Sequence, residues 1–351
     1  MELEQAKKRV EELRAVIEKN NRLYYDQDAP ELEDFEYDAL TRELKELEAQ
    51  FPQLVTASSP TQKVGGTASS KLPKVTHAVK MESLLDAFSY DELRDFDRRV
   101  REAGIEPEYV VEIKIDGLSC SLEYENGELV RASTRGDGVV GEDVTANVAT
   151  LTCLPRSIEL PKGIGKIELR GECYMSEKDF EAANAKQAEA GKKLFANPRN
   201  CAAGSLRQAD PSIARERNLQ VFVFNVQSVN NGDAAQFSPY HCDQLNYLRD
   251  ICGFKTTYYA HCNDIDSILA AIYDIEEKRY DIDYPIDGAV IKVDELSIRQ
   301  KMGERTKTPK WAIAYKYPAE EKGTVLRNIQ LQTGRTGRVT PVAVFDPIQL
   351  A

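Results

Sequence analysis

Residues 110–117 read Val-Val-Glu-Ile-Lys-Ile-Asp-Gly, and this stretch decides how the rest of the chain is interpreted. On a β-strand, alternate side chains share a face, so we expect Glu112, Lys114 and Asp116 to lie together. A lysine amine must lose its proton before it can act as a nucleophile, whereas two flanking carboxylates favour the charged amine. A nucleophilic Lys114 therefore requires further cations nearby. The alternative interpretation is an exposed strand whose charged side chains form salt bridges.

Two later stretches can supply those cations. Residues 287–293, DGAVIKV, form a second apolar strand that carries Lys292, and residues 311–318, WAIAYKYP, form a third that carries Lys316. One lysine on an apolar strand is often an edge residue whose ammonium group reaches water. Three such strands predict a single site at which the lysines converge on an anion.

The pattern between about residues 81 and 320 is mixed and predicts an α+β domain with antiparallel sheets. Helical stretches cover residues 176–190 and 264–277. Asn126-Gly127 joins two alternating runs, which is a β-hairpin signal. The strand-like runs are residues 109–114, 119–124, 129–134, 166–172, 219–226 and 288–293.

Residues 136–141, GDGVVG, match the dinucleotide-binding fingerprint G-x-G-x-x-G, so a dehydrogenase is a competing function. That fingerprint requires a parallel βαβ unit. The strand before these glycines is the second arm of the Asn126-Gly127 hairpin and is therefore antiparallel, which disfavours a dehydrogenase. Arg135, just before the glycines, is a better candidate as a donor to a phosphate or a ribose.

Residues 2–52 predict two helices that pair as a hairpin, because apolar residues recur at spacings of three and four. The loop-like stretch SSPTQKVGGTASSKLP follows within residues 53–80. Strand-like sequence returns after about residue 325, and we expect the polypeptide to be an N-terminal fragment that stops inside a further module. The expected domains are residues 1–70, 71–320 and 321–351.

Charge is distributed unevenly along the chain. The net charge is −12, and residues 1–52, with 15 acidic and 8 basic side chains, account for −7 of it. The helical hairpin is therefore not expected to follow a phosphate backbone. A basic run comes late in the chain: Arg299, Lys301, Arg305, Lys307, Lys310 and Lys316.

The seven cysteines are odd in number and irregular in spacing, which disfavours a disulfide framework and fits a reducing cytoplasm. One cluster resembles a metal site: His241-Cys242, Cys252 and His261-Cys262. Adjacent His-Cys pairs do not easily aim both side chains at one ion, so no metal ligands are expected there. The chain has no secretory signal and no apolar run long enough to span a membrane.

The motifs together resemble those of bacterial NAD-dependent DNA ligases, from about residue 5 to the end. Lys114-Ile115-Asp116-Gly117 is similar to the K-x-D-G motif of nucleotidyl transfer, which is weakly specific alone. The supporting motifs are specific in order and spacing: SPTQKVGG at 59–66, TRGDG at 134–138, RGE at 170–172, FANPRNCAAGSLRQ at 195–208, IDGAVIKV at 286–293 and WAIAYKYP at 311–318. GRTGRVTPVA at 334–343 resembles the opening of the family's OB-fold domain. Lys80 departs from the family, in which proline is expected.

The resemblance implies roles for the residues around the strand lysines. Lys114 attacks the α-phosphate of NAD, and nicotinamide mononucleotide (NMN) leaves. Glu112 accepts a hydrogen bond from the adenine amino group, and Phe224 stacks on the ring. The remaining implied contacts are Arg135 and Glu172 to the ribose and phosphate region, Lys292 and Lys316 to the α-phosphate, Ser83 and Leu84 along the nucleotide pocket, and Arg199, Arg207 and Arg279 toward DNA or the NMN phosphate.

The helical hairpin carries a polar cluster around its turn: Tyr24, Tyr25, Asp34, Tyr37 and Asp38. From the residues alone this cluster could be a hydrated, acidic helix end. The resemblance implies that it holds the NMN half of NAD, whose cationic ring is attracted by aromatic faces and carboxylates. Tyr25 stands where some relatives carry histidine.

The expected function is self-adenylation of Lys114 by NAD with Mg²⁺. In the complete enzyme, AMP would pass to the 5′-phosphate at a nick in double-stranded DNA. We expect a cytoplasmic monomer that does not bind membranes. Two alternatives stay open: an ATP-using ligase or capping-type nucleotidyltransferase, which would lack the tyrosine- and aspartate-bearing hairpin, and a non-catalytic NAD-binding module, which would not become labelled by NAD.

Overall fold

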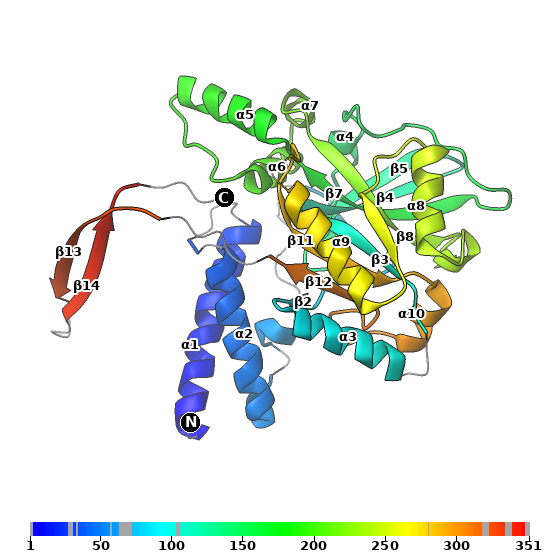
Figure 1. The fold of residues 1–351 in the computed structure, drawn as a ribbon. Coiled ribbons are helices and arrows are strands. Elements are labelled where there is room, and N and C mark those ends of the chain that lie inside the picture. The colour runs from blue at the N-terminus through cyan, green and yellow to red at the C-terminus, as the bar shows by residue number, and fades with distance from the viewer. Residues whose placement is uncertain are drawn as a thin grey trace. The chain divides into compact units, whose positions relative to one another are not determined.

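The computed structural model describes residues 3–26, 31–32, 34–56, 58–62, 72–102, 106–279, 281–317, 323–333 and 339–347. It contains two compact units, Met1–Lys316 and Tyr317–Ala351, and each is described by itself. The first unit combines a helical hairpin with two five-stranded sheets and is of the α+β class, as the sequence predicted (Figure 1). Within the described residues, no helix has both the length and the apolar character that crossing a membrane requires.

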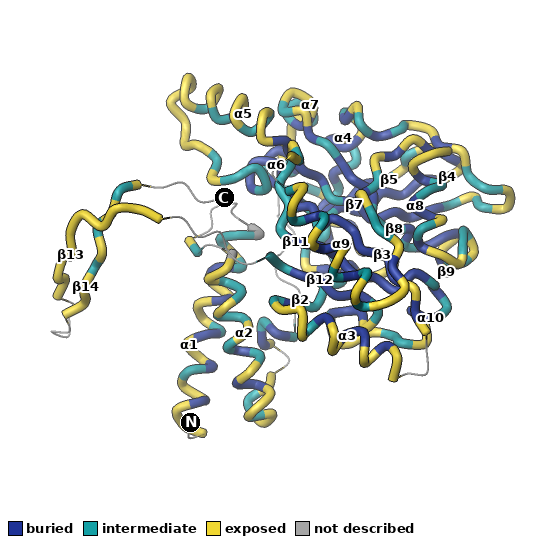
Figure 2. The backbone as a smooth tube through the Cα atoms, viewed as in Figure 1, coloured by how far each residue is buried: buried dark blue, intermediate teal, exposed yellow. Residues whose placement is uncertain are grey.

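The N-terminal hairpin consists of α1 (Leu3–Asn21) and α2 (Asp34–Gln50), with one π-helical turn, η1 (Arg22–Asp26), after α1. Its predicted apolar stripe is confirmed, because Val10, Leu13 and Ile17 are buried against Leu44 and Leu47. Figure 2 shows the buried positions recurring along each helix, while the other positions are intermediate or exposed. The 3₁₀ turns η2 (Pro52–Leu54) and η3 (Pro60–Gln62) follow.

The first sheet has the strand order β10-β3-β11-β12-β2. Its neighbours are antiparallel except for β12 and β2, which run parallel. Helices α3 (Tyr90–Glu102) and α9 (Ile265–Lys278) pack against this sheet (Figure 1). The strands are β2 (Asp86–Ala87), β3 (Tyr109–Ile115), β10 (Tyr259–Cys262), β11 (Ile286–Val293) and β12 (Ala312–Lys316).

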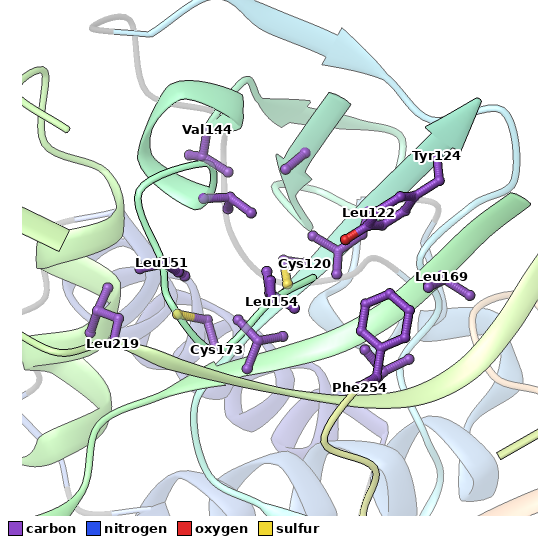
Figure 3. Close-up of a cluster of buried hydrophobic side chains, with 14 of the residues drawn as sticks. Cys120, Leu122, Tyr124, Val144, Leu151, Leu154, Leu169, Cys173, Leu219 and Phe254 are labelled. Atoms are coloured by element: carbon purple, nitrogen blue, oxygen red, sulfur yellow. The ribbon is translucent and has the colours of Figure 1, made fainter. Parts of the chain in front are cut away.

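The second sheet has the order β5-β4-β7-β8-β9 and is antiparallel throughout. Its strands are β4 (Leu118–Glu125), β5 (Glu128–Thr134), β7 (Lys166–Tyr174), β8 (Gln220–Val229) and β9 (Gly232–Asp233). Apolar side chains from these strands, the adjoining helices and nearby loops form a buried hydrophobic cluster, which includes Leu122, Leu169 and Phe254 (Figure 3).

Shorter elements complete the first unit. Strands β1 (Lys74–Thr76) and β6 (Val140–Glu142) form a separate antiparallel pair. The helices are α4 (Thr145–Val148), α5 (Glu177–Glu189), α6 (Pro198–Leu206), α7 (Ser212–Glu216), the 3₁₀ turn η4 (Ala234–Gln236), α8 (His241–Asp250) and α10 (Leu296–Met302). The predicted helices at 176–190 and 264–277 are confirmed as α5 and α9, with Ser176 and Asp264 as their N-caps.

The hairpin predicted at Asn126-Gly127 is confirmed. Both residues have positive φ, 50° and 85°, as a tight turn between twisted strands requires. Strand β5 is therefore antiparallel to β4, and the GDGVVG segment leads into β6 rather than into a helix. The segment does not open a βαβ unit, so it is not a dinucleotide-binding fingerprint.

The second unit contains an antiparallel pair, β13 (Leu326–Thr333) and β14 (Val339–Phe345). Arg327 and Asp346 form an exposed ion pair between its ends. The side chains of both strands are mostly exposed within this unit.

Candidate functional site

The two sheets and the hairpin border a cavity of about 870 Å³. Its lining brings together residues that lie far apart in the sequence. The predicted site residues among them are Tyr24, Tyr37, Asp38, Ser83, Leu84, Glu112, Lys114, Arg135, Glu172, Phe224, Lys292 and Lys316. The side chains of Tyr25 and Asp34 lie outside the described residues.

Lys114 lies near the end of β3 and faces Asp287 of β11. Its Nζ donates to both carboxylate oxygens of Asp287 at 2.7 Å. The register between β3 and β11 shifts between Ile286 and Gly288, so Asp287 occupies a bulge. Bulges re-aim side chains, and this one gives Lys114 its carboxylate partner. Burial opposes the charge of Asp287, but Lys114 and Lys316 outweigh it and lower the carboxyl pKa.

Glu112, Lys114 and Asp116 all line the cavity, as their alternation along the strand predicted. Each of the two carboxylates also has a cationic partner on another element. Asp116 accepts from Arg199 at 2.9 Å, and Glu112 is buried with Lys292. The glycine that ends the motif has a steric cause, because a Cβ on Gly117 would lie 2.3 Å from the carbonyl oxygen of Cys173.

Lys316 ends β12 and reaches the helical hairpin. Its Nζ donates to Asp38 Oδ2 at 2.7 Å. Lys316 and Lys114 both pair in register with Gly288, on opposite sides of β11. Burial opposes the positive charge of Lys316, but the carboxylates of Asp287, Asp38 and Asp86 outweigh it and raise the pKa of this lysine. The lysine therefore stays charged and links β12 to the helical hairpin.

Glu112 is the most buried carboxylate of the cavity, with 1% of its surface exposed. It forms an ion pair with Lys292 at 2.7 Å and accepts a hydrogen bond from His241 Nε2 at 2.8 Å. Burial alone would raise its pKa, but Lys292 and His241 lower it to about 2. Lys292 Nζ also donates to the carbonyl oxygen of Phe224 at 2.9 Å and lies 5.2 Å from the centroid of the Phe224 ring.

The cavity also contains the carboxyl group of Glu172 and the guanidinium group of Arg199. Burial raises the pKa of Glu172 to about 7, although Ser119 Oγ donates to it at 2.7 Å. Arg199, besides pairing with Asp116, lies with its guanidinium carbon 4.7 Å from the centroid of the Tyr24 ring. The carboxyl of Glu172 can therefore carry a proton near neutral pH, whereas Arg199 connects the hairpin to the K-x-D-G strand.

Residues 69–320 match the family model of the NAD-dependent DNA ligase adenylation domain. The chain belongs to the NAD-dependent DNA ligase family. Residues 3–65, which contain the helical hairpin, match the model of the DNA ligase-like N-terminal NAD+-binding domain. The family resemblance drawn from the motifs is confirmed.

Curated relatives of this ligase family agree with that assignment. A DNA ligase of Acetivibrio thermocellus is 51% identical over 346 residues, which are 98% of this chain and 51% of the relative. A DNA ligase of Shouchella clausii is 46% identical over 353 residues, 100% of this chain and 51% of the relative. The chain spans about half the length of the curated relatives it matches.

The sequence pattern did not identify two residues of the site, His241 and Thr257. His241 was considered only as a possible zinc ligand, yet it is fully buried and contacts Glu112. A signal for this was present, because His241, Leu245 and Leu248 share one helix face at spacings of four and three. Thr257 donates to Glu112 at 2.9 Å, and no motif in the sequence marks it.

Two of the His-Cys segments meet at Asp294, because Cys242 Sγ donates to its Oδ2 at 3.1 Å and His261 Nε2 lies 3.5 Å from the same oxygen. His261 also lies 3.5 Å from a carboxylate oxygen of Glu108, and Glu108, His261 and Asp294 are not among the residues that line the cavity. All seven cysteines are free.

Of the late basic run, Arg299 is buried, and its Nε donates to the carbonyl oxygen of Val293. Arg207 Nε donates to the carbonyl oxygen of Ala203 within its own helix end, at 3.3 Å.

Proposed function

We propose that this chain transfers AMP from NAD to its own Lys114 and releases NMN. The observation that carries the proposal is the position of Lys114 in a cavity shared by the adenylation domain and the NAD+-binding hairpin. The Lys114 nitrogen forms a bond to the α-phosphorus. The bond from that phosphorus to the bridging oxygen breaks, and its electron pair leaves with NMN. Asp287, 2.7 Å from Nζ, is the nearest acceptor for the proton that the amine loses.

The proposed nucleotide contacts follow the same cavity. Glu112 accepts from the adenine amino group, and Phe224 stacks on the ring. We place Lys292 at the adenine edge rather than at the α-phosphate, to which the family resemblance assigned it, because its Nζ pairs with Glu112 at 2.7 Å. Lys316 stabilises charge that develops on the α-phosphate, which requires it to exchange Asp38 for the phosphate. The further proposed contacts are Arg135 and Glu172 to ribose and phosphate, with Ser83 and Leu84 along the pocket wall.

The hairpin residues are proposed to bind the NMN half. Tyr24, Tyr37 and Asp38 line the cavity and offer aromatic faces and a carboxylate to the cationic nicotinamide ring. Tyr25 and Asp34 are included in this proposal from the sequence. Asp38 would then pair with the nicotinamide while Lys316 turns to the phosphate.

Mg²⁺ is proposed as the metal of the reaction. Asp116 and Glu172 fit it, because both offer carboxylate oxygens in the cavity and their charges interact with each other. A cation there would favour the ionised form of Glu172, whose pKa is raised by burial. When bound, Mg²⁺ would neutralise phosphate charge.

The complete protein is proposed to be a DNA ligase that passes AMP to the 5′-phosphate at a DNA nick and seals it. We propose three modules: the helical NMN-binding part at 1–70, the nucleotidyltransferase domain at 71–320 and the start of an OB-fold at 321–351. We also propose that the protein is a cytoplasmic monomer. Its seven free thiols agree with a reducing cytoplasm.

The test is an intact-mass measurement after incubation of the chain with NAD and Mg²⁺. We expect a mass increase of one AMP and release of NMN, with no such increase from ATP. The control is Lys114→Ala. An ADP-ribose adduct, or an unchanged mass with NAD, would contradict the proposal.

A further inference from the structure

The buried carboxylate of Glu112 accepts from three side chains. One oxygen accepts from His241 Nε2 at 2.8 Å and from Lys292 Nζ at 2.7 Å. The other accepts from Thr257 Oγ1 at 2.9 Å. A carboxylate has about four lone-pair sites, so these three donors leave about one acceptor site for a ligand. Glu112, Lys292 and Thr257 all line the cavity.

His241 acts in this network as a hydrogen-bond donor. Burial, with the cations Lys292 and Arg299 facing it, lowers the imidazole pKa to about 4 despite the carboxylate of Glu112. The ring is therefore neutral at physiological pH and carries a single proton. Because Nε2 faces a carboxylate oxygen, the proton belongs on Nε2. Nδ1 finds no partner among the side chains and backbone groups that the structure describes.

The two donors are anchored by the backbone. His241 begins α8, and its N–H donates to the carbonyl oxygen of Asp294 at 3.1 Å. The next N–H of the helix, that of Cys242, donates to the Asp294 carboxylate at 2.8 Å. Thr257 is followed by Tyr258, whose carbonyl oxygen accepts from the N–H of Ile113 at 3.2 Å. Asp294 in turn donates its N–H to the carbonyl oxygen of Glu108, the residue before β3, at 2.8 Å. Both donors are thus held by backbone hydrogen bonds to β3, which carries Glu112, or to the residue before it.

We propose that His241 and Thr257 are positioning residues for adenine selection: they fix the Glu112 carboxylate so that its remaining acceptor site receives the exocyclic amino group of the adenine in NAD. This inference rests on the proposed function. Glu112 can rotate about its side-chain bonds if only Lys292 holds it, because a flexible ammonium group imposes little direction. Two rigid, neutral donors on opposite oxygens define the plane of the carboxylate.

Neighbouring threonines provide a matched test. Thr257→Val removes the hydroxyl that contacts Glu112 and keeps the shape. Thr256→Val makes the same change one residue earlier, where the buried Oγ1 has no partner within the described part of the chain. The probe is deamino-NAD, in which hypoxanthine replaces adenine and the amino group is absent. Attachment of AMP or IMP to each variant is followed by intact mass over a range of dinucleotide concentrations.

We expect the unmodified chain to prefer NAD over deamino-NAD by at least about 100-fold. Thr257→Val should reduce that preference on the order of tenfold, the effect of losing one hydrogen bond to a charged group. The half-saturating NAD concentration should rise while the maximal rate changes little, because Lys114 and Asp287 are untouched. Thr256→Val should keep the full preference.

Variants of His241 supply a second test. His241→Leu should lower the preference for NAD at least tenfold, and His241→Gln should restore it to within about threefold, because the glutamine amide can donate in place of Nε2. Full preference in both Thr257→Val and His241→Leu, or equal losses in Thr256→Val and Thr257→Val, overturns the inference. An unmodified chain that attaches no AMP overturns the proposed function as well, whereas equal use of both dinucleotides overturns the role of Glu112.

Discussion

Replacing Lys292 by methionine tests how the buried charges under the nucleotide cavity are balanced. In the folded protein, the side chains of Lys292 and Glu112 are only 7% and 2% exposed, and they are paired at 2.7 Å. Removing one partner of a buried pair costs about 3–5 kcal/mol, because the other charge stays buried. His241 and Thr257 continue to donate to Glu112, so we expect the lower end, a loss of about 3 kcal/mol.

The double variant Glu112→Gln/Lys292→Met separates the charge effect from lost packing. Both charges are then absent, and replacing both partners of a buried pair is often close to neutral. We expect the double variant to regain about 2 of the 3 kcal/mol, which is a coupling energy typical of contacting residues.

Urea unfolding followed by fluorescence measures both variants. The chain has a single tryptophan, Trp311. The guanidinium carbon of Arg299, whose charge faces His241, lies 4.4 Å from the centroid of the Trp311 ring. With a denaturant slope of about 3 kcal/mol/M, a loss of about 3 kcal/mol lowers the midpoint by about 1 M. A shift below about 0.3 M for Lys292→Met, or a double variant less stable than either single variant, would refute the reasoning.

Three further predictions concern the site. Lys114→Ala should abolish the AMP adduct in intact-mass measurements and should leave the urea midpoint nearly unchanged, because Lys114 is only partly buried; an adduct on the variant would contradict its assignment as nucleophile. Alanine at Tyr24, Tyr37 or Asp38 should slow adenylation by NAD at least about tenfold, yet spare transfer of AMP out of a preformed adduct in a full-length relative; equal losses in both steps would indicate a structural role. The free energy of unfolding should fall by about 3 kcal/mol between pH 6.5 and pH 4 because of His241. In the folded protein its pKa is about 4, below the ordinary 6.5, so mainly the unfolded imidazole gains a proton in that window. Urea midpoints at several pH values measure this slope, and His241→Gln should flatten it.

Local sequence determined the parts of this protein that depend on neighbouring residues. Apolar spacing in α1 and α2 specifies which helix faces meet, since residues three and four apart share a face. The positive φ values that Asn126 and Gly127 adopt explain the hairpin between β4 and β5, and with it the exclusion of a dinucleotide fingerprint. The ordered motifs around Lys114 identified the ligase family before any contact was known.

Only the tertiary structure decided which charges meet. Alternation along β3 places Glu112 and Lys114 on one face, but it carries no information about the strands beside them. The bulge at Asp287 selects the partner of Lys114, and the register with β11 and β12 brings Lys316 near it. His241 reaches Glu112 from a helix that begins 129 residues later in the chain. Such contacts depend on register and packing between distant elements, which the hydrophobic pattern of any single element does not specify.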